Sequence, residues 1–336
     1  MKRNVTLDYM RGLAILIVIL GHALLAAWDG VPKENGSYQL VINCQMILLM
    51  FISGIAGGFS FPSEKPGKFL IKKITRLLIP YIIWAEIYAM INAIACEDVL
   101  EVDTFIRAIY ASDFWFLRYL FVLYVIWFGV NVVFNFLGKR LSLQEKQSEL
   151  LLMGLLILSI GGVYVLSKLP IISQSISIWF YVWFLLGYIV YTKKSWFQKN
   201  IVVFEGIGTL SIDAMVIVII ATMAGGTIPA QVQGAILVLG ICYASYFMCK
   251  YLPKWFIERM TALGKNTLPI YAIHWCLFFA PLYNNLTYRK LIAWDKLPYV
   301  VNVCIIFGFL LLTTLICIWI FRKWKVTRVL LMGESK

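Results

Sequence analysis

Two residues in the first apolar segment of the chain, Arg11 and His22, have side chains that can do chemistry. They are eleven positions apart in the stretch from Leu7 to Trp28, which is long enough to cross a bilayer. At ~100° per residue, eleven residues close three helical turns with only about 20° left over, so both side chains point to the same side. Because an ionisable residue is costly to keep inside a membrane, His22 is a candidate functional residue and Arg11 its partner on that face.

Each residue also has a plainer interpretation. Arg11 alone is compatible with an anchor that reaches the membrane surface, and His22 alone with a polar contact between helices. Together with a basic patch at the inner face, the pair permits acyl transfer without requiring it: a histidine with an unperturbed pKa of ~6.5 accepts a proton from an alcohol as a general base. Cationic side chains at the inner end would hold the phosphates of a thioester donor. Asp8, three residues before Arg11, is its nearest local charge partner.

A cluster of basic residues follows the second apolar segment. The stretch from Lys68 to Leu78 alternates basic and apolar residues and runs into Pro80, which opens the third segment. Lys73 and Arg76 are three positions apart and are expected to share a helix face. The stretch predicts either a surface helix in contact with anionic lipid or a binding site for a phosphorylated ligand.

A second histidine occurs late in the chain, in the stretch Gly264 to His274. Asn266 or Thr267 is expected to cap a helix here, and Pro269 suits its first turn. His274 would then enter the membrane on its inner half, either as a functional residue or as a histidine that is hydrogen-bonded between helices.

Two carboxylates interrupt other apolar segments, Glu86 in the third and Asp213 in the seventh. Carboxylates within a membrane usually face the protein interior and pair with another group. We expect both to be buried, and either of them to orient a histidine or to balance the charge of Arg11.

These residues must be positioned by membrane helices, because the 336 residues are 61% hydrophobic and have a mean hydropathy of +0.83. The predicted fold is an all-α polytopic membrane protein formed by one domain, residues 1–336. Neither a metal site nor a disulfide framework is expected, since the two histidines and seven cysteines show no metal-ligand spacing. Ten apolar segments are predicted, at roughly 9–28, 39–61, 79–96, 115–137, 149–167, 175–191, 201–223, 231–249, 268–287 and 298–321.

The basic residues predict the orientation of these helices. With the N-terminus in the cytoplasm, 22 of the 30 Lys and Arg residues fall on the cytoplasmic side, which places both termini there. The connection after the third segment, expected outside, is acidic, with Glu97, Asp98, Glu101 and Asp103. The net charge of +13 is therefore explained by topology, and no nucleic-acid partner is expected.

Five segments, in order along nearly the whole chain, resemble the integral-membrane acyltransferase family 3. The most specific is LDYMR, which is followed after ten residues by His22. The others are MFISGIAGG with Ser53, KKITRLLIPY with Lys73 and Arg76, DFWFL with Trp115, and GKNTLPIYAIH with Tyr271 and His274.

The resemblance implies a membrane acyltransferase of the O-acetyltransferase type, with cytoplasmic acetyl-CoA or another acyl-CoA as donor. Its acceptor would be a hydroxyl group of a glycan, a lipid-linked sugar or another envelope molecule. The implied catalytic residues are His22, Arg11 and Asp8. The implied donor contacts are Arg11, Lys73, Arg76, Ser53, Tyr271 and His274, and the candidate supporting residues are Glu86, Trp115, Arg118 and Asp213.

The chain departs from the family pattern in two ways. Arg118 follows Trp-Phe-Leu where an uncharged residue is more usual, which suggests an anionic acceptor. The SGNH-type extracytoplasmic domain of some members is absent, so transfer is expected to be completed by the membrane part or by a separate partner.

The alternative function is a transporter of a small substrate such as an amino acid, or an exporter of the acyl donor, with Glu86 and Asp213 as coupling residues. A third interpretation is a membrane assembly subunit without activity. The expected location is the bacterial cytoplasmic membrane, as a multi-pass protein without a permanently bound cofactor. Association into homo-oligomers is left open.

Overall fold

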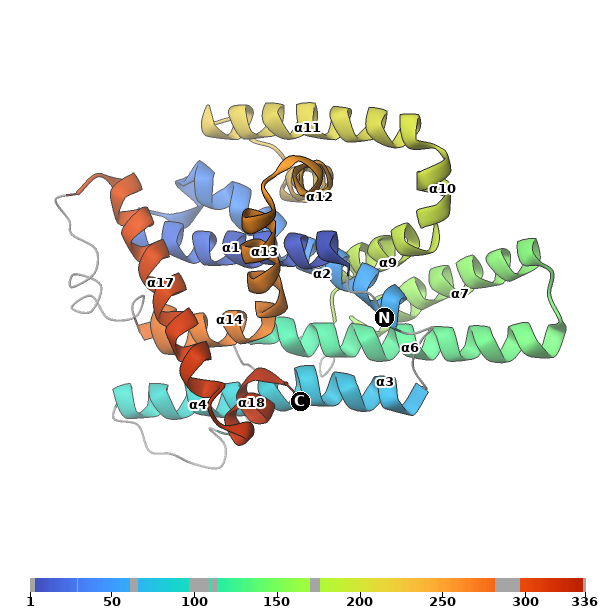
Figure 1. Ribbon diagram of the computed structural model, residues 1–336, viewed down its shortest axis with the longest axis horizontal. Coiled ribbons are helices and arrows are strands. Elements are labelled where there is room, and N and C mark those ends of the chain that lie inside the picture. Colours follow the sequence, from blue (N-terminus) through green and yellow to red (C-terminus); the bar gives the residue numbers. More distant parts are fainter. Residues whose placement is uncertain are drawn as a thin grey trace. The chain divides into compact units, whose positions relative to one another are not determined.

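The structure of the chain is a computed structural model. It describes residues 4–28, 30–60, 66–96, 105, 109, 114–169, 176–281 and 297–334. All regular elements in these ranges are helices, which confirms the predicted all-α membrane fold (Figure 1). The acidic connection that contains Glu97, Asp98, Glu101 and Asp103 lies outside the described residues.

Eight helical segments in the described ranges are long and apolar enough to cross a membrane. They are α1 (Val5–Ala27), α2 (Gly36–Ser60), the segment Gly67–Ala93, α6 (Trp115–Leu141), α7 (Glu145–Leu166), α11 (Ile201–Met223), α12 (Ala230–Tyr251) and α17 (Tyr299–Phe321). Shorter apolar helices, α9 (Ile178–Thr192) and the segment Thr267–Phe279, lie in the other two predicted segments.

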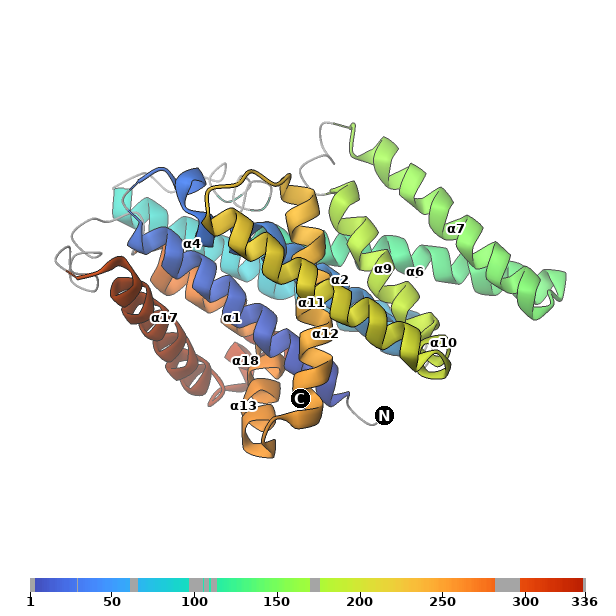
Figure 2. The same ribbon diagram turned by 90° about the horizontal axis from the view of Figure 1, so that it is seen from above.

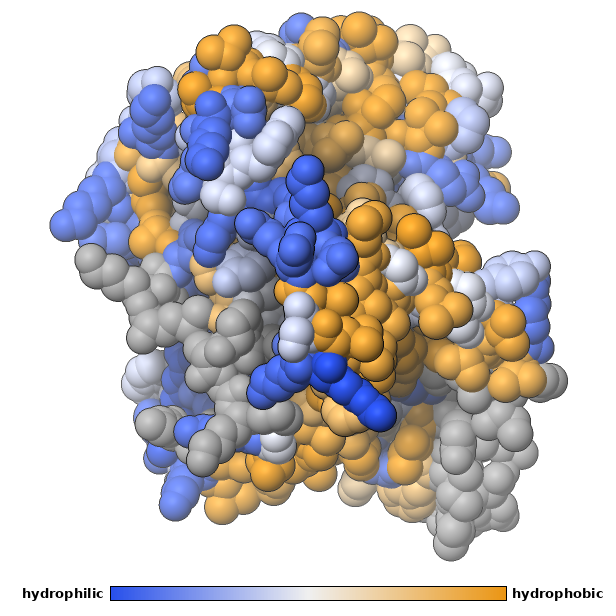
Figure 3. Space-filling view, turned by 90° about the vertical axis from the view of Figure 1, so that its right-hand side faces the viewer, coloured by the Kyte–Doolittle hydropathy of each residue, from blue (hydrophilic) through white to orange (hydrophobic). Residues whose placement is uncertain are grey.

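Many large apolar side chains lie on the surface of these helices. On α7 and α11, for example, Leu158 and Val202 are 71% and 78% exposed. Hydrophobic residues also cover broad areas of the face drawn in Figure 3, beside groups of hydrophilic residues. This is the surface expected of helices whose outer sides contact lipid.

The basic stretch after α2 continues directly into the third membrane segment. It forms α3 (Pro66–Lys73), then a π-helix, η3 (Ile74–Leu78), then α4 (Ile79–Cys96). In η3 the N–H of Ile79 donates to the carbonyl of Ile74, five residues earlier. The π-turn ends just before Pro80, which has no N–H to donate and whose ring crowds the carbonyl four residues before it. The proline is therefore accommodated without ending the helix.

The chain divides into two compact units, one of Met1–Ile52 with Lys193–Trp324 and one of Ser53–Thr192 with Lys325–Lys336. In the first unit α1 is the central element, because α12, α13 (Lys254–Lys265), α14 (Thr267–Ile273) and α17 all pack against it (Figures 1 and 2). Other short helices of this unit include η1 (Pro32–Glu34) and α10 (Lys194–Lys199).

Two glycines allow the backbones of α1 and α13 to touch where the helices cross (Figure 1). A Cβ atom on Gly12 would overlap the carbonyl oxygen of Met260, and one on Gly264 would overlap the carbonyl oxygen of Asp8. Because glycine has no Cβ, the helices approach more closely than other residues permit. This crossing fixes the position of α1 against the end of α13, from which α14 continues.

In the second unit, α2 contacts α6 and α9 through the glycines of the MFISGIAGG segment. A Cβ on Gly54 would overlap the carbonyl oxygen of Phe184 in α9, and the hydroxyl of Tyr124 in α6 donates to the carbonyl of Ser53 at 2.7 Å. The final helix, α18 (Lys325–Met332), packs against α4, where Trp84 Nε1 donates to the carbonyl of Leu331 at 2.8 Å.

Candidate active site

The two histidines of the chain are in direct contact, although 252 residues separate them in the sequence. Nδ1 of His22 in α1 lies 2.9 Å from Nε2 of His274, and Nδ1 of His274 lies 2.7 Å from the carbonyl oxygen of Ile270. His274 is fully buried, whereas His22 is half-buried. The distances correspond to two consecutive hydrogen bonds.

The direction of these hydrogen bonds follows from their last acceptor. A carbonyl oxygen only accepts, so Nδ1 of His274 carries the proton that is donated to Ile270. In a neutral imidazole the other nitrogen is then an acceptor, so Nε2 of His274 accepts from Nδ1–H of His22. By the same rule, Nε2 of His22 has a lone pair and no proton. The pair therefore presents one basic nitrogen, Nε2 of His22. The hydrogen bond from Nδ1–H of His22 to His274 fixes the tautomer and the orientation of the His22 ring.

A π-helix, η4 (His274–Phe279), completes the surroundings of His22. The ring centre of His22 lies 5.0 Å from those of His274 and Trp275 and 4.4 Å from that of Phe279. In an α-helix, positions five apart, such as 274 and 279, would point about 140° away from each other. The i+5 hydrogen bonding of a π-helix, here from Ala280 N–H to the Trp275 carbonyl, brings them back towards one side. Three side chains of η4 thus contact one histidine.

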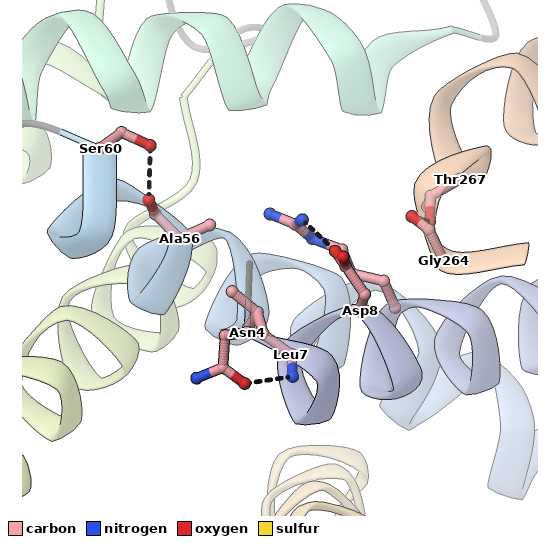
Figure 4. A network of polar contacts seen from close by, with 8 residues as sticks. Asn4, Leu7, Asp8, Ala56, Ser60, Gly264 and Thr267 are labelled. Carbon is pink, nitrogen blue, oxygen red and sulfur yellow. Dashed lines mark hydrogen bonds and ion pairs between the residues drawn. The ribbon is translucent and has the colours of Figure 1, made fainter. Parts of the chain in front are cut away.

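At the other end of α1, Asp8 and Arg11 form an ion pair of 3.0 Å. The Asp8 side chain is 3% exposed and that of Arg11 is 31% exposed. The helix begins just before them, where the Asn4 side chain accepts from the backbone N–H of Leu7 at 3.1 Å (Figure 4). A carboxylate in the first turn interacts favourably with the helix dipole. Asp8 is therefore placed to hold the Arg11 guanidinium close to α1.

The link between α13 and α14 differs from the predicted cap. Asn266 occupies the N-cap position of α14, but its side chain donates back to the carbonyl of Ala262 and accepts from Arg322, the residue that follows α17. Thr267 likewise donates to the carbonyl of Gly264 at 2.8 Å (Figure 4). Both side chains thus bind helix ends that lie beside them, and neither caps α14. Pro269 lies in the first turn of α14, as expected.

The model of the acyltransferase domain that defines acyltransferase family 3 matches residues 4–322. The chain belongs to acyltransferase family 3. The match includes both histidines and every other candidate site residue, and it confirms the predicted family and the acyltransferase class. No curated protein and no solved structure matches the chain.

Two of the three basic residues predicted to bind the donor, Lys73 and Arg76, lie in the second unit of this acyltransferase. The Lys73 ammonium lies over the Tyr124 ring, 3.3 Å from its centre, and 5.1 Å from that of Phe69. Arg76, in η3, is exposed, and its backbone contacts Gly333 just after α18. The aromatic rings therefore hold the Lys73 charge in place, whereas Arg76 presents its charge at the surface.

The structure places the other predicted residues as follows. Tyr271 is buried, and its ring is inclined by 63° to that of His274, at 6.2 Å between ring centres. Ser53 uses its backbone carbonyl to accept from Tyr124. Trp115 is stacked on Phe180 at 5.4 Å, and Arg118 donates to the carbonyl of Ile109 at 3.2 Å.

The expectation that both membrane carboxylates are buried is wrong for one of them. Asp213 is exposed on α11, and among the described residues Arg11 pairs with Asp8 and His22 with His274, not with Asp213. The helical period explains the difference, since Asp213 falls on the side of α11 away from α12, against which that helix packs. Glu86 is half-buried, and its Oε2 is buried without a hydrogen-bond partner among the described residues.

Within the described ranges, no group of three or more His, Cys, Asp or Glu side chains is arranged to hold a metal ion. The cysteines that the structure describes are free, and two of them, Cys44 and Cys276, are buried in helices. Sequence reasoning did not single out Trp275 and Phe279, although both follow His274 closely. The only available signal was their aromatic character, and nothing in the sequence indicated a π-helix.

Proposed function

We propose that this membrane acyltransferase moves an acetyl or other short acyl group from acyl-CoA to a hydroxyl group of a glycan or another envelope acceptor. The observation that carries this proposal is the pair of hydrogen bonds from His22 through His274 to the Ile270 carbonyl. It leaves Nε2 of His22 as a basic nitrogen in a fixed direction, which a general base requires. His274 acts as a positioning residue for this base.

The reaction follows from the chemistry of a thioester and a hydroxyl group. Nε2 of His22 takes the hydroxyl proton as the hydroxyl oxygen bonds to the carbonyl carbon of the thioester. The C–S bond then breaks, and the CoA thiolate leaves and takes the proton back from His22. The products are an ester and free CoA, and the enzyme returns to its starting state.

His274 contributes while the proton is on His22. Once Nε2 is protonated, His22 carries a positive charge, and its Nδ1–H still donates to Nε2 of His274. A hydrogen bond from a charged donor is stronger than one from a neutral donor. The histidine pair therefore stabilises the imidazolium that forms during the reaction.

We propose Arg11, Lys73 and Arg76 as contacts of the donor phosphates, on the cytoplasmic side of the bacterial membrane. The Lys73 ammonium over the Tyr124 ring and the exposed Arg76 support this role, because phosphates are bound by such cations. Transport of a small substrate remains the alternative, but of its two suggested coupling carboxylates Asp213 is exposed and Glu86 is half-buried.

The test is acyl transfer from labelled acyl-CoA by the purified protein, with His22→Asn and His274→Asn variants at matched abundance. Asparagine keeps some hydrogen bonding but takes no proton near neutral pH. We expect His22→Asn to lower the rate by ~100- to 10,000-fold, and His274→Asn to retain more activity because it can still hold the His22 ring. Near-wild-type turnover by His22→Asn contradicts the proposed mechanism.

A further inference from the structure

Trp275 follows His274 in η4 and has a buried polar atom that the mechanism above does not use. Its ring centre lies 5.0 Å from that of His22, with the ring planes inclined by 60°. The indole Nε1 is buried and has no hydrogen-bond partner among the residues that the structure describes. Buried indole N–H groups usually have an acceptor, so an unpaired one beside a basic histidine calls for an explanation.

Of the four ring nitrogens of the histidine pair, only Nε2 of His22 has a free lone pair, and Trp275 Nε1 makes no hydrogen bond to it. Nδ1 of His22 and Nδ1 of His274 both donate, and Nε2 of His274 already accepts from His22. Phe279, whose ring centre lies 5.0 Å from that of Trp275, is apolar. The acceptor for Trp275 is therefore expected to come from a molecule that binds beside His22.

An acyl thioester supplies such an acceptor. When the hydroxyl oxygen bonds to the carbonyl carbon, the electron pair of the C=O π bond moves onto the carbonyl oxygen. That oxygen then has a negative charge and lies close to His22, because the same histidine takes the hydroxyl proton. When the C–S bond breaks, the pair re-forms the carbonyl group of the ester and the thiolate leaves. A hydrogen-bond donor beside this oxygen lowers the barrier for both steps.

We propose that Trp275 is a catalytic residue whose Nε1–H donates to the carbonyl oxygen of the acyl group, an inference that rests on the proposed function. The indole suits this role because it is a donor only, so it cannot compete with His22 for the hydroxyl proton. The position of Trp275 is fixed by η4, where its own carbonyl accepts from Ala280 N–H. A donor that is held in place before the substrate binds needs no reorganisation during the reaction.

The decisive variant keeps the shape of Trp275 and removes only the N–H. Replacement by β-(3-benzothienyl)alanine, in which sulfur stands where the indole has N–H, does this, and Trp275→Phe is the simpler companion variant. Trp319→Phe is the matched control, because Trp319 in α17 is 64% exposed and is not among the rings that the structure describes beside His22. All variants are compared in the purified full-length protein, together with His22→Asn.

Two measurements are made on each protein. The first is turnover of labelled acyl-CoA, for which we expect both Trp275 variants to lose ~100- to 1,000-fold in kcat with a much smaller rise in KM, and Trp319→Phe to match wild type. The second is binding of two unreactive CoA analogues, a ketone that keeps the carbonyl oxygen and a thioether that lacks it. Wild type should prefer the ketone, and the benzothienyl protein should bind both equally.

The outcomes separate this inference from the proposed function. If His22→Asn is inactive while the benzothienyl protein keeps wild-type kcat, the role of Trp275 is refuted and the function of His22 stands. If the benzothienyl protein loses activity but still prefers the ketone analogue, Trp275 serves packing and the inference is again refuted. Wild-type turnover by His22→Asn would instead overturn the proposed function itself.

Discussion

Replacing Gly264 by alanine should disturb the histidine pair from a distance, through the crossing of α1 and α13. A Cβ at this position would overlap the carbonyl oxygen of Asp8 and lie 2.9 Å from the backbone N of Gly12. Both are backbone atoms, which cannot rotate away as the end of a side chain can. The helices must therefore separate by roughly 1 Å or more to restore ordinary contact, and overpacking of this kind costs ~1–3 kcal/mol.

The effect on activity follows from the length of the His22–His274 hydrogen bond. At 2.9 Å it tolerates little separation, because a donor and acceptor ~1 Å further apart no longer form a hydrogen bond. α14 continues from α13 and carries the chain to His274, so a shift at Gly264 reaches this contact. A displacement of ~1 Å in a catalytic geometry costs about 100-fold in rate. We expect Gly264→Ala to lower turnover by that order while the protein still inserts into the membrane.

The assay is acyl transfer from labelled acyl-CoA together with a thermal melt of the purified protein. Gly206→Ala is the matched control, since a Cβ on Gly206 in α11 meets no other atom within 4 Å. In that open position alanine is expected to be neutral or to raise stability by about 0.4–1 kcal/mol. If Gly264→Ala matches wild type in both turnover and melting temperature, the crossing does not set the position of His274.

The remaining predictions concern the donor site, the Arg11 ion pair and the topology. Reversing two charges, Lys73→Glu with Arg76→Glu, should weaken binding of a CoA analogue by at least 10-fold, since each lost contact with a charged group is worth ~1.5–3 kcal/mol; unchanged binding would make this stretch a lipid anchor. Asp8→Asn should lower the melting temperature, because the Arg11 guanidinium loses its nearly buried carboxylate partner, and an unchanged melt would show that the pair is not stabilising. Reporter fusions should read inside after Lys194, and the opposite result would remove the basis for a cytoplasmic donor.

The helices of this protein were predictable because the length and the apolar composition of each stretch predict a membrane helix without information from the rest of the chain. A membrane segment satisfies its backbone hydrogen bonds within itself, so length and apolarity are enough to locate it. The stretch around Arg11 and His22 could be assigned to one helix for the same reason, and α1 extends without a break from Val5 to Ala27. The resemblance to acyltransferase family 3 added the candidate roles of the histidines, which composition and helical periodicity alone could not supply.

The contacts between helices were decided only by the tertiary structure. No local rule connects His22 with His274, because their meeting depends on how α1 packs against α13 and α14 through Gly12 and Gly264. The π-helix that brings Phe279 to the same side as His274 is equally invisible in the sequence, since helix propensity does not distinguish it from an α-helix. Asp213 was wrongly predicted to be buried, because the residues beside it in the sequence are apolar. Burial depends instead on which side of a helix packs against another helix, and Asp213 lies on an exposed side.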